Sequence, residues 1–364
     1  MSMKLGITGA YGFLGAAITA QALAAGYEVV AFASRRKEHP LFSNGDVETR
    51  SLRLGTDTAI DLTGIDSLIH AAGATSFRAA DRRAVWDANV LGSRALYEAA
   101  LERGLSRFVD LSSVNALGSV DGIPADETSA AGYSTRYPSV FLSPQEALAA
   151  ADASAKGEYA ILRRSKVTYF DSKMAACELS KRYARERGLP LVTVFPGTAV
   201  GPGDLNHGIA RFVDMVWEGR LAMAPAGSTT YMDSRDFARG VIAALERGRV
   251  GEGYILAGKP EDTMSYAAFM GRINGLALRE GLPRRRAFRP LVLPPLLAYA
   301  GASIAEALVP GLGLYSALAL SGAIRQEYRS DKARAELGYD PATPLDVSIC
   351  ACREFSLRHG ERLQ

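Results

Sequence analysis

The sequence predicts an α/β fold in which helices cover both faces of a doubly wound parallel sheet. Short runs rich in β-branched residues alternate with longer helical stretches through the first half of the chain. A glycine-rich turn separates the first of these runs from the first helical stretch. The 364 residues, 48% of them hydrophobic, are enough for one large domain and a smaller lobe.

The predicted elements follow in order along the chain. The strands are expected at Lys4–Thr8, Glu28–Ala33, Val47–Leu52, Ser67–His70, Arg107–Leu111 and Leu191–Phe195. Stretches of small and apolar residues predict helices at Phe13–Ala25, Val85–Arg103 and Met174–Arg187, each followed by a glycine that can end it.

The second half of the chain changes rhythm and predicts a second lobe. A helix near Ile209–Glu218 precedes a return to the sheet, and the chain from about residue 259 is helical and interrupted by proline and glycine. We expect a dinucleotide-binding domain over residues 1–200, rejoined by 231–258. Residues 201–230 and 259–364 would then form a smaller, mainly C-terminal substrate-binding lobe.

Composition excludes several classes of protein. The chain has 42 Lys and Arg against 39 Asp and Glu, spread along its length, so nucleic acid is not an expected partner. Cys177, Cys350 and Cys352 form no ligand pattern with the four scattered histidines, and we expect neither a disulfide nor a metal site. The first strand begins at Lys4, leaving no room for a signal peptide, so a cytoplasmic location is expected.

One stretch is apolar enough to raise the question of a membrane. Prolines, glycines and Glu306 interrupt Leu291–Ile324 before ~20 uninterrupted apolar residues accumulate, so no integral membrane segment is expected. Between buried helices of the substrate lobe and a peripheral membrane contact, we interpret the stretch as buried helices.

The glycine-rich turn Thr8-Gly9-Ala10-Tyr11-Gly12-Phe13-Leu14-Gly15 connects the first strand to the first helix. Bare backbone there can approach a pyrophosphate, and the helix N-terminus favours its charge. A tight turn with no ligand is the alternative, but the order of strand, loop and helix favours dinucleotide binding and a Rossmann-like fold.

The end of the second strand indicates which dinucleotide is bound. An enzyme that uses NAD usually carries an acidic residue there, to hold the adenosine ribose. This chain has Ser34, Arg35 and Arg36, and two guanidinium groups suit the 2′-phosphate of NADP(H). A solvated turn is the alternative reading of the two arginines.

Tyr169 and Lys173 are four residues apart, and on a helix they would share one face. A phenol becomes a proton relay when a fixed ammonium beside it favours the phenolate. Tyr328 and Lys332 have the same spacing, but they follow the apolar lobe, and we interpret them as the start of a surface helix. Ser112 and Ser113 end the fifth predicted strand, at the edge where such sheets bind ligands.

Several motifs now stand in one order. They are the glycine turn, His70-Ala71-Ala72-Gly73, Asn89-Val90-Leu91-Gly92, Ser112-Ser113, Tyr169 with Lys173, and Pro196-Gly197. Together they resemble the extended short-chain dehydrogenases, part of the NAD-dependent epimerase/dehydratase superfamily. The segments Ser113–Gly118 and Gly251–Leu256 look more like the branch of dihydroflavonol reductases and 3β-hydroxysteroid dehydrogenases than like the enzymes of nucleotide sugars.

The resemblance implies hydride exchange between a nicotinamide and a ketone or secondary alcohol. Tyr169 would pass the proton, Ser113 would bind the substrate oxygen and Lys173 would hold the tyrosine and the ribose. Asn89 would support a water in the proton relay. Cofactor contacts would come from Gly9, Tyr11, Gly12, Phe13, Leu14, Gly15, Ser34, Arg35, Arg36, Leu54, Ala71, Ala72, Gly73, Ser112, Tyr169, Lys173, Pro196, Gly197 and Thr198. The Tyr169–Arg187 helix would form a homodimer.

Three features depart from the family pattern. Arg53-Leu54 stands where an Asp-Leu pair usually faces the adenine, and Phe195-Pro196 stands where Arg-Pro is common. The stretch between Ser113 and Tyr169 is longer than expected, so residues 119–168 are interpreted as an insert. Its Ser143–Ala155 portion predicts a helix, and the insert would act as a lid over the nicotinamide end of the cleft.

Two other functions remain open at this point. A nucleotide-sugar epimerase or dehydratase would use the same serine, tyrosine and lysine with a cofactor that stays bound. Val114-Asn115 after Ser113, where dehydratases of this family tend to have Asp-Glu, argues against that reading. The minor alternative is a non-enzymatic NADP sensor, and such relatives tend to lack the tyrosine and lysine pair.

Overall fold

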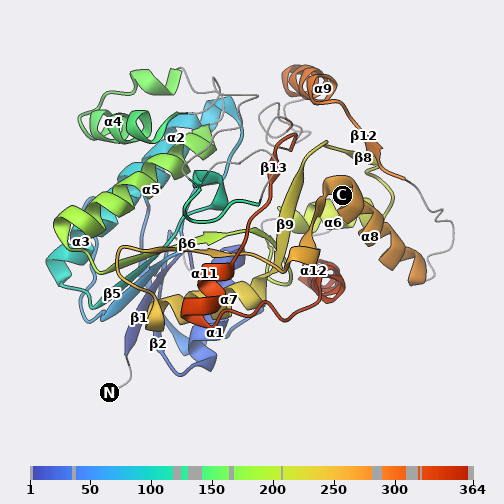
Figure 1. Cartoon of the computed structure of the whole chain (residues 1–364). Helices are drawn as coiled ribbons and strands as arrows, with labels where there is room; N and C mark the ends of the chain where they lie inside the picture. Colours follow the sequence, from blue (N-terminus) through green and yellow to red (C-terminus); the bar gives the residue numbers. More distant parts are fainter. Residues whose placement is uncertain are drawn as a thin grey trace.

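The computed structural model describes residues 3–34, 38–117, 124–129, 142–163, 168–205, 208–280, 289–308, 319 and 322–359. Its centre is a seven-stranded sheet in which every neighbouring pair is parallel, in the order β10-β6-β5-β4-β1-β2-β3 (Figure 1). The strands are β1 Lys4–Thr8, β2 Glu28–Ala33, β3 Val47–Ser51, β4 Ser67–His70, β5 Arg107–Leu111, β6 Leu191–Pro196 and β10 Gly253–Leu256. The strand order reverses between β1 and β4, as in a Rossmann fold, and the predicted fold class is confirmed.

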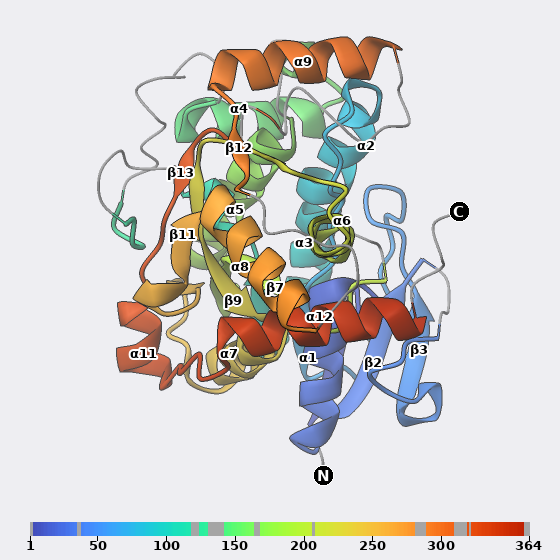
Figure 2. The ribbon, with the colours of Figure 1, turned by 90° about the vertical axis from the view of Figure 1, so that its right-hand side faces the viewer.

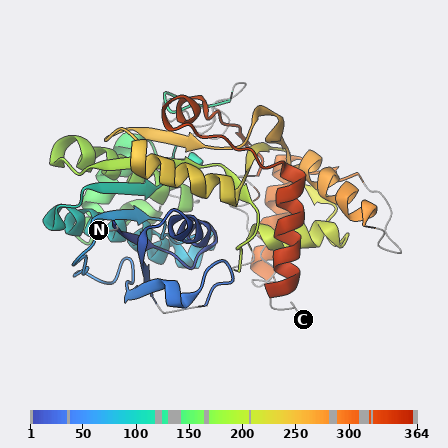
Figure 3. The same cartoon turned by 90° about the horizontal axis from the view of Figure 1, so that it is seen from below.

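Helices cover both faces of this sheet. One face carries α1 Phe13–Ala24 and α7 Ser234–Arg247, with α11 Asp331–Leu337 against α7. The other carries α2 Arg82–Trp86, α3 Ser93–Arg103, α4 Pro144–Ala155 and α5 Thr168–Arg187 (Figures 1 and 3). Because the central strands are buried on both sides, they consist of nearly continuous apolar runs without alternation.

The remaining elements form a second lobe beside the carboxyl ends of the strands (Figure 2). Its sheet consists of β7 Thr198–Val200, β9 Ser228–Asp233, β11 Thr263–Ser265 and β13 Arg325–Gln326. A separate hydrophobic cluster joins α6 Ile209–Trp217, α8 Tyr266–Arg279 and α12 Leu345–His359. A short parallel pair, β8 Met223–Ala224 and β12 Leu291–Val292, leads into α9 Pro295–Leu308.

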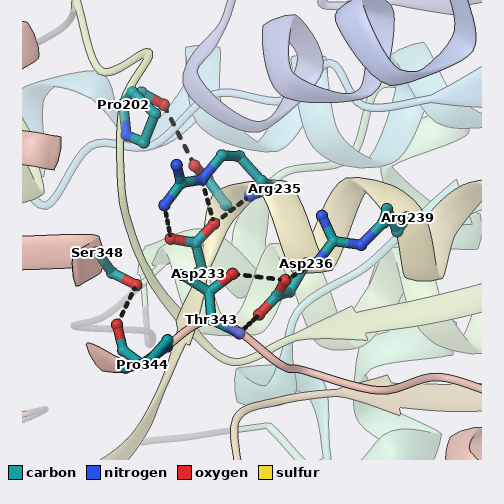
Figure 4. Close-up of polar contacts among 9 residues, drawn as sticks. Pro202, Asp233, Arg235, Asp236, Arg239, Thr343, Pro344 and Ser348 are labelled. Atoms are coloured by element: carbon teal, nitrogen blue, oxygen red, sulfur yellow. Dashed lines mark hydrogen bonds and ion pairs between the residues drawn. The ribbon is translucent and has the colours of Figure 1, made fainter. Parts of the chain in front are cut away.

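A polar network fixes the second lobe to the first at the start of α7 (Figure 4). Asp233 caps that helix by accepting a 2.7 Å bond from the backbone N–H of Arg235, and it also pairs with the Arg235 guanidinium. Asp236 accepts bonds of 2.8 Å from both the backbone N–H and the hydroxyl of Thr343, just before α12. Ser234 donates to the carbonyl of Pro202. The network therefore ties the loop after β7 and the segment before α12 to the start of α7.

The structure corrects three sequence-based predictions. The predicted helix Val85–Arg103 contains a π-helical turn at Asp87–Gly92 between α2 and α3. The prediction that Leu291–Ile324 forms buried helices is wrong for α9, because no residue of this helix is buried. Tyr328 does not start a surface helix, because it is 3% exposed and lies before α11. Within the described ranges, no helix has the length and apolarity needed to cross a bilayer.

Candidate active site

A cleft runs along the carboxyl edge of the parallel sheet. One cavity, of about 430 Å³, lies over the ends of β1, β2 and β3, and a second, of about 540 Å³, lies over β5, β6 and the second lobe. The two cavities share Gly12, Ala71 and Gly73 in their walls, so they form one continuous site. This is the edge at which open α/β sheets bind their ligands.

The glycine turn shapes the middle of the cleft. Gly9 has a φ of +68°, and a Cβ on Gly15 would lie 2.0 Å from the carbonyl oxygen of Gly9. Gly12 caps α1 with no side-chain hydrogen bond, and the first turn of that helix has no acidic residue. The exposed N–H groups of α1 therefore face the cleft and offer a site for a pyrophosphate.

The first cavity suits an adenosine. Ser34, Leu54 and Ala72 line it, as predicted for cofactor contacts, together with Gly9 and Tyr11. Arg53 also lines it, and among the described residues of its wall there is no carboxylate. Arg35 and Arg36, on which the NADP prediction rests, lie outside the described residues.

The second cavity brings together the predicted catalytic side chains. Ser113 at the end of β5 and Tyr169 and Lys173 on α5 all line it. The Lys173 ammonium donates a 3.4 Å bond to the carbonyl oxygen of Leu111. The Tyr169 ring packs edge-on against Phe77 with its centroid 5.6 Å away, which orients the phenol. The cavity wall also contains the other predicted residues of this end: Phe13, Leu14, Gly15, Ser112, Pro196, Gly197 and Thr198.

The two serines at the end of β5 differ in what they offer a ligand. The Ser113 oxygen accepts a 3.2 Å bond from the backbone N–H of Asn115, which leaves its proton to be donated. The buried Ser112 hydroxyl has no hydrogen-bond partner among the described residues. That hydroxyl is covered by the protein and lies beside the buried Cys177 thiol, so the Ser113 hydroxyl is the one left for a ligand.

Asn89 lies behind the cleft and not in its wall. Its side chain accepts a 2.7 Å bond from the backbone N–H of Ala74 and donates to the Ala74 carbonyl and to the Ser172 hydroxyl. A Cβ on Gly73 would lie 3.1 Å from Oδ1 of Asn89 and 3.3 Å from Nζ of Lys173. Asn89 therefore links the loop after β4 to the turn of α5 that carries Lys173.

A directed chain of hydrogen bonds fixes the neutral form of His70 beneath the site. The Ala72 N–H donates to Thr8 Oγ1, which lies 2.7 Å from His70 Nδ1, and His70 Nε2 lies 3.0 Å from Ser93 Oγ. The Ser93 proton goes to the Asn89 carbonyl, so the imidazole must donate from Nε2 and accept at Nδ1. Burial lowers the pKa of His70 to about 3, so this chain stays uncharged.

Two buried carboxyls next to the predicted catalytic residues give a testable pH dependence. Burial raises the pKa of Asp110 to about 6 and that of Asp171 to about 7. The folded chain then holds protons that the unfolded chain has lost, so stability falls as pH rises from ~4 to ~7. We expect Asp171→Asn, which keeps the acceptor for the Leu142 N–H, to remove part of this loss.

The measurement is urea unfolding at about pH 5 and pH 8. The wild-type chain should lose a few kcal/mol of unfolding free energy between the two, and the variant should lose less, because only Asp110 still keeps a raised pKa. Asp331→Asn, which removes a carboxylate with a 76% exposed side chain, is the matched control. An equal pH dependence in the wild type and Asp171→Asn would contradict the assignment.

The second tyrosine and lysine pair serves another purpose. The Tyr328 hydroxyl donates a 3.2 Å bond to the carbonyl of Val114, and the Lys332 ammonium pairs with Glu252 at 2.6 Å. Neither residue lines the two cavities. Chain order favours Tyr169 over Tyr328 as the catalytic tyrosine, and of the two only Tyr169 lines the cleft.

The described part of the insert packs on the sheet domain. α4 lies along α5 with Ala147 and Ala151 buried, and the Arg182 guanidinium holds Asp152 with two nitrogens. No α4 residue lines either cavity. Residues 119–123, 130–141 and 164–167 of the insert lie outside the described residues, so the lid stays a prediction.

Sequence reasoning missed the residues that the second lobe brings to the cleft. Gln326 on β13 lines the second cavity and donates a 2.8 Å bond to the side-chain oxygen of Asn115. Asp204 lines it as well and caps the start of α6 by accepting from the Ala210 N–H. Ile209 adds an apolar wall. No local motif marks these residues, because long-range packing alone brings them together.

The fold and the site define a nicotinamide-dependent enzyme of the extended short-chain dehydrogenase type. The sequence profile of the family described as "NAD dependent epimerase/dehydratase family" matches residues 5–168 and 139–257. The matched segments cover more than half of the chain. The chain therefore belongs to the NAD-dependent epimerase/dehydratase family.

Individual relatives agree over nearly the whole length. A Synechocystis sp. protein, named provisionally as a dihydroflavonol 4-reductase, is 28% identical over 372 residues, covering 97% of this chain and 94% of the relative. A 3-beta-hydroxysteroid dehydrogenase of Mycolicibacterium neoaurum is 24% identical, with 96% and 90% covered. A dTDP-glucose 4,6-dehydratase of Streptomyces venezuelae, solved as a double mutant with NAD bound, superposes with a TM-score of 0.71 at 19% identity, with 98% of each chain covered.

Proposed function

We propose that this chain is an NADP(H)-dependent oxidoreductase that interconverts a ketone and a secondary alcohol. The observation that carries the proposal is the joint presence of Ser113, Tyr169 and Lys173 in one cavity, which continues into the glycine turn. A proton donor, an oxygen-binding hydroxyl and a fixed ammonium are the groups that a carbonyl reduction needs from the protein.

In the reduction, Ser113 donates a hydrogen bond to the substrate carbonyl oxygen and Tyr169 delivers its phenolic proton to the same oxygen. A nicotinamide held by the glycine turn and the wall of the second cavity would supply the hydride for the carbonyl carbon. Lys173, held by the Leu111 carbonyl, stabilises the phenolate that remains. Asn89 and Gly73 fix the position of the lysine, and a proton from solvent restores the phenol. Oxidation of the alcohol uses the same residues in reverse.

The preference for NADP(H) rests on the end of the cleft over β2 and β3. Ser34 and Arg53 line that cavity, and the sequence places Arg35 and Arg36 immediately after Ser34. We expect the double substitution Arg35→Ala with Arg36→Ala to weaken NADPH binding by ~10-fold or more, because charge-assisted bonds to a phosphate are lost.

Binding of NADH provides the internal control, since it has no 2′-phosphate and should change little. Fluorescence titration of the wild type and the double variant with both cofactors gives the four dissociation constants. An equal loss of affinity for the two cofactors, or no loss for either, would contradict the assignment.

The substrate is proposed to be hydrophobic. The relatives include a protein named for a hydroxysteroid, and Val114 and Ile209 contribute apolar walls to the second cavity. The test is NADPH oxidation in the presence of steroid, flavonoid and long-chain β-keto compounds. Activity with one of these ketones would support the proposal, and activity confined to sugar nucleotides would overturn it.

A nucleotide-sugar epimerase or dehydratase is the second candidate, because the family includes both activities and the dehydratase of Streptomyces venezuelae shares the fold. Such an enzyme would convert its sugar without net consumption of cofactor. Val114-Asn115 after Ser113 supports the reductase instead.

We also propose how the chain divides into a cofactor-binding and a substrate-binding part. Residues 1–200 and about 231–258 would bind the cofactor, and residues 201–230 and 259–364 would bind the substrate. A homodimer through α5 also stays a prediction, because α4 packs along that helix and a partner would have to bind beside it. Light scattering would distinguish the 38.8 kDa monomer from a dimer. A cytoplasmic location is likewise a prediction.

A further inference from the structure

Helix α9 presents an apolar face outward, the reverse of an ordinary surface helix. Its exposed positions are Leu296, Leu297, Ala300, Gly301, Ile304, Ala307 and Leu308. Leu296 is 78% exposed and Leu308 is 76% exposed. The polar residues Tyr299, Ser303 and Glu306 are half-buried on the other side. A surface helix normally has its charged and polar residues toward water, so this outward face is built for contact with something apolar.

The strand before the helix and its partner strand also carry exposed apolar side chains. Leu291 and Val292 of β12 are 62% and 47% exposed, and Met223 of β8, paired with Leu291, is 51% exposed. We call Met223, Leu291, Val292, Leu296, Leu297, Ile304 and Leu308 the apolar patch. It contains seven of the eleven large hydrophobic side chains that are exposed in the described part of the chain. The exposed apolar residues are thus concentrated on α9 and on the two-stranded sheet that leads into it.

The patch lies far from the cofactor end of the molecule. Figures 1 and 2 show α9 at the outer end of the second lobe, away from the parallel sheet. No residue of α9 lines either cavity of the cleft. The helix has 14 residues, or about 21 Å at 1.5 Å per residue, and is shorter than the ~30 Å hydrocarbon core of a bilayer. It therefore suits a position in the plane of an interface and not across it.

The chemistry of the patch favours lipid over protein. Protein interfaces are enriched in aromatic residues, and the exposed positions of α9 have only aliphatic side chains and glycine. Arg289, exposed, stands two residues before Leu291, and in the sequence Arg284, Arg285 and Arg286 precede it, outside the described residues. No acidic residue interrupts the outward face. A cluster of basic residues next to an apolar segment is attracted to anionic lipid headgroups.

We propose that the apolar patch docks this chain on the surface of an anionic lipid bilayer. The helix α9 lies parallel to the membrane, Leu296, Ile304 and Leu308 enter the acyl region, and Arg289 meets the lipid phosphates. The docking is reversible, because one short helix and a few basic side chains give modest affinity.

Vesicle sedimentation tests this directly. Wild-type protein is centrifuged with vesicles of phosphatidylcholine alone and with vesicles that also contain phosphatidylglycerol. We expect binding to the anionic vesicles that weakens with salt, and a loss of about tenfold or more in Leu296→Glu with Ile304→Glu. Arg289→Gln should weaken the salt-dependent part. The matched control is Leu357→Glu on α12, where the leucine is 67% exposed outside the patch, and it should bind as the wild type does.

Other results would overturn the proposal. These are no sedimentation with anionic vesicles, an equal loss in Leu357→Glu, or a dimer in light scattering that the double substitution converts to a monomer. The last result would assign the patch to a second copy of the chain. Circular dichroism and NADPH binding show whether each variant is folded. Sedimentation does not depend on turnover, so the outcome is separate from that of the proposed reaction.

Discussion

Replacing Tyr169 with phenylalanine is expected to lower turnover by ~10²-fold or more while NADPH still binds. The variant keeps the ring that packs against Phe77 and removes only the hydroxyl that delivers the proton. The alkoxide that forms at the substrate oxygen would then depend on solvent for its proton. Steady-state turnover with a ketone and a fluorescence titration with NADPH give the two quantities.

The matched control is Tyr328→Phe, which removes the hydroxyl of the other tyrosine with a lysine four residues on. That hydroxyl donates to the Val114 carbonyl, so its loss should cost about 1 kcal/mol of stability and leave turnover within a few-fold. Unchanged turnover in Tyr169→Phe would refute the role given to Tyr169. A large loss of turnover in both variants would show that the effect is not specific to the Tyr169 hydroxyl.

Replacing Lys173 with methionine is expected to lower turnover by a similar ~10²-fold and to weaken NADPH binding as well. The ammonium lies at the Leu111 carbonyl, next to Gly73 and in the cavity wall. Its removal takes away the positive charge that stabilises the phenolate of Tyr169 and a donor for the cofactor ribose. Turnover and the dissociation constant of NADPH should therefore both change.

Lys332→Met is the control for this substitution. Lys332 forms an ion pair with Glu252 and lies 4.7 Å above the ring of Tyr254, remote from the cleft wall. The change should lower stability by about 1 kcal/mol without affecting NADPH binding. If Lys332→Met impaired turnover as much as Lys173→Met, the distinction between the two pairs would be wrong.

The sheet could be predicted from the sequence almost residue by residue. Strands such as Lys4–Thr8 and Arg107–Leu111 are buried on both faces, so their apolar runs are continuous and end sharply. The start of α5 was placed too late, at Met174, because Tyr169-Phe170-Asp171-Ser172 has low intrinsic helix propensity. Packing against α2 and α4 decides that the helix begins at Thr168.

Other parts of the site depend on information that local patterns do not contain. Asn115 and Gln326 meet across 211 positions of the chain, and only the packing of β13 on β9 brings them to one cavity. The π-helical turn that contains Asn89 is a rare i→i+5 irregularity inside a helix, and no residue type in Asp87–Gly92 marks it in the sequence. The exposure of α9 was missed because apolar composition predicts contact with an apolar environment without saying which one.

The most direct test of the central claim is the transfer of deuterium from NADPH that carries deuterium at both hydrogen positions of the nicotinamide C4 atom. The wild-type enzyme is incubated with the labelled cofactor and the ketone that gives the fastest NADPH oxidation. Mass spectrometry or NMR then locates the label. The proposed reaction predicts one deuterium on the carbinol carbon of the alcohol for each NADPH consumed. Conversion of a sugar nucleotide with no net consumption of NADPH, and no ketone reduced, would contradict it.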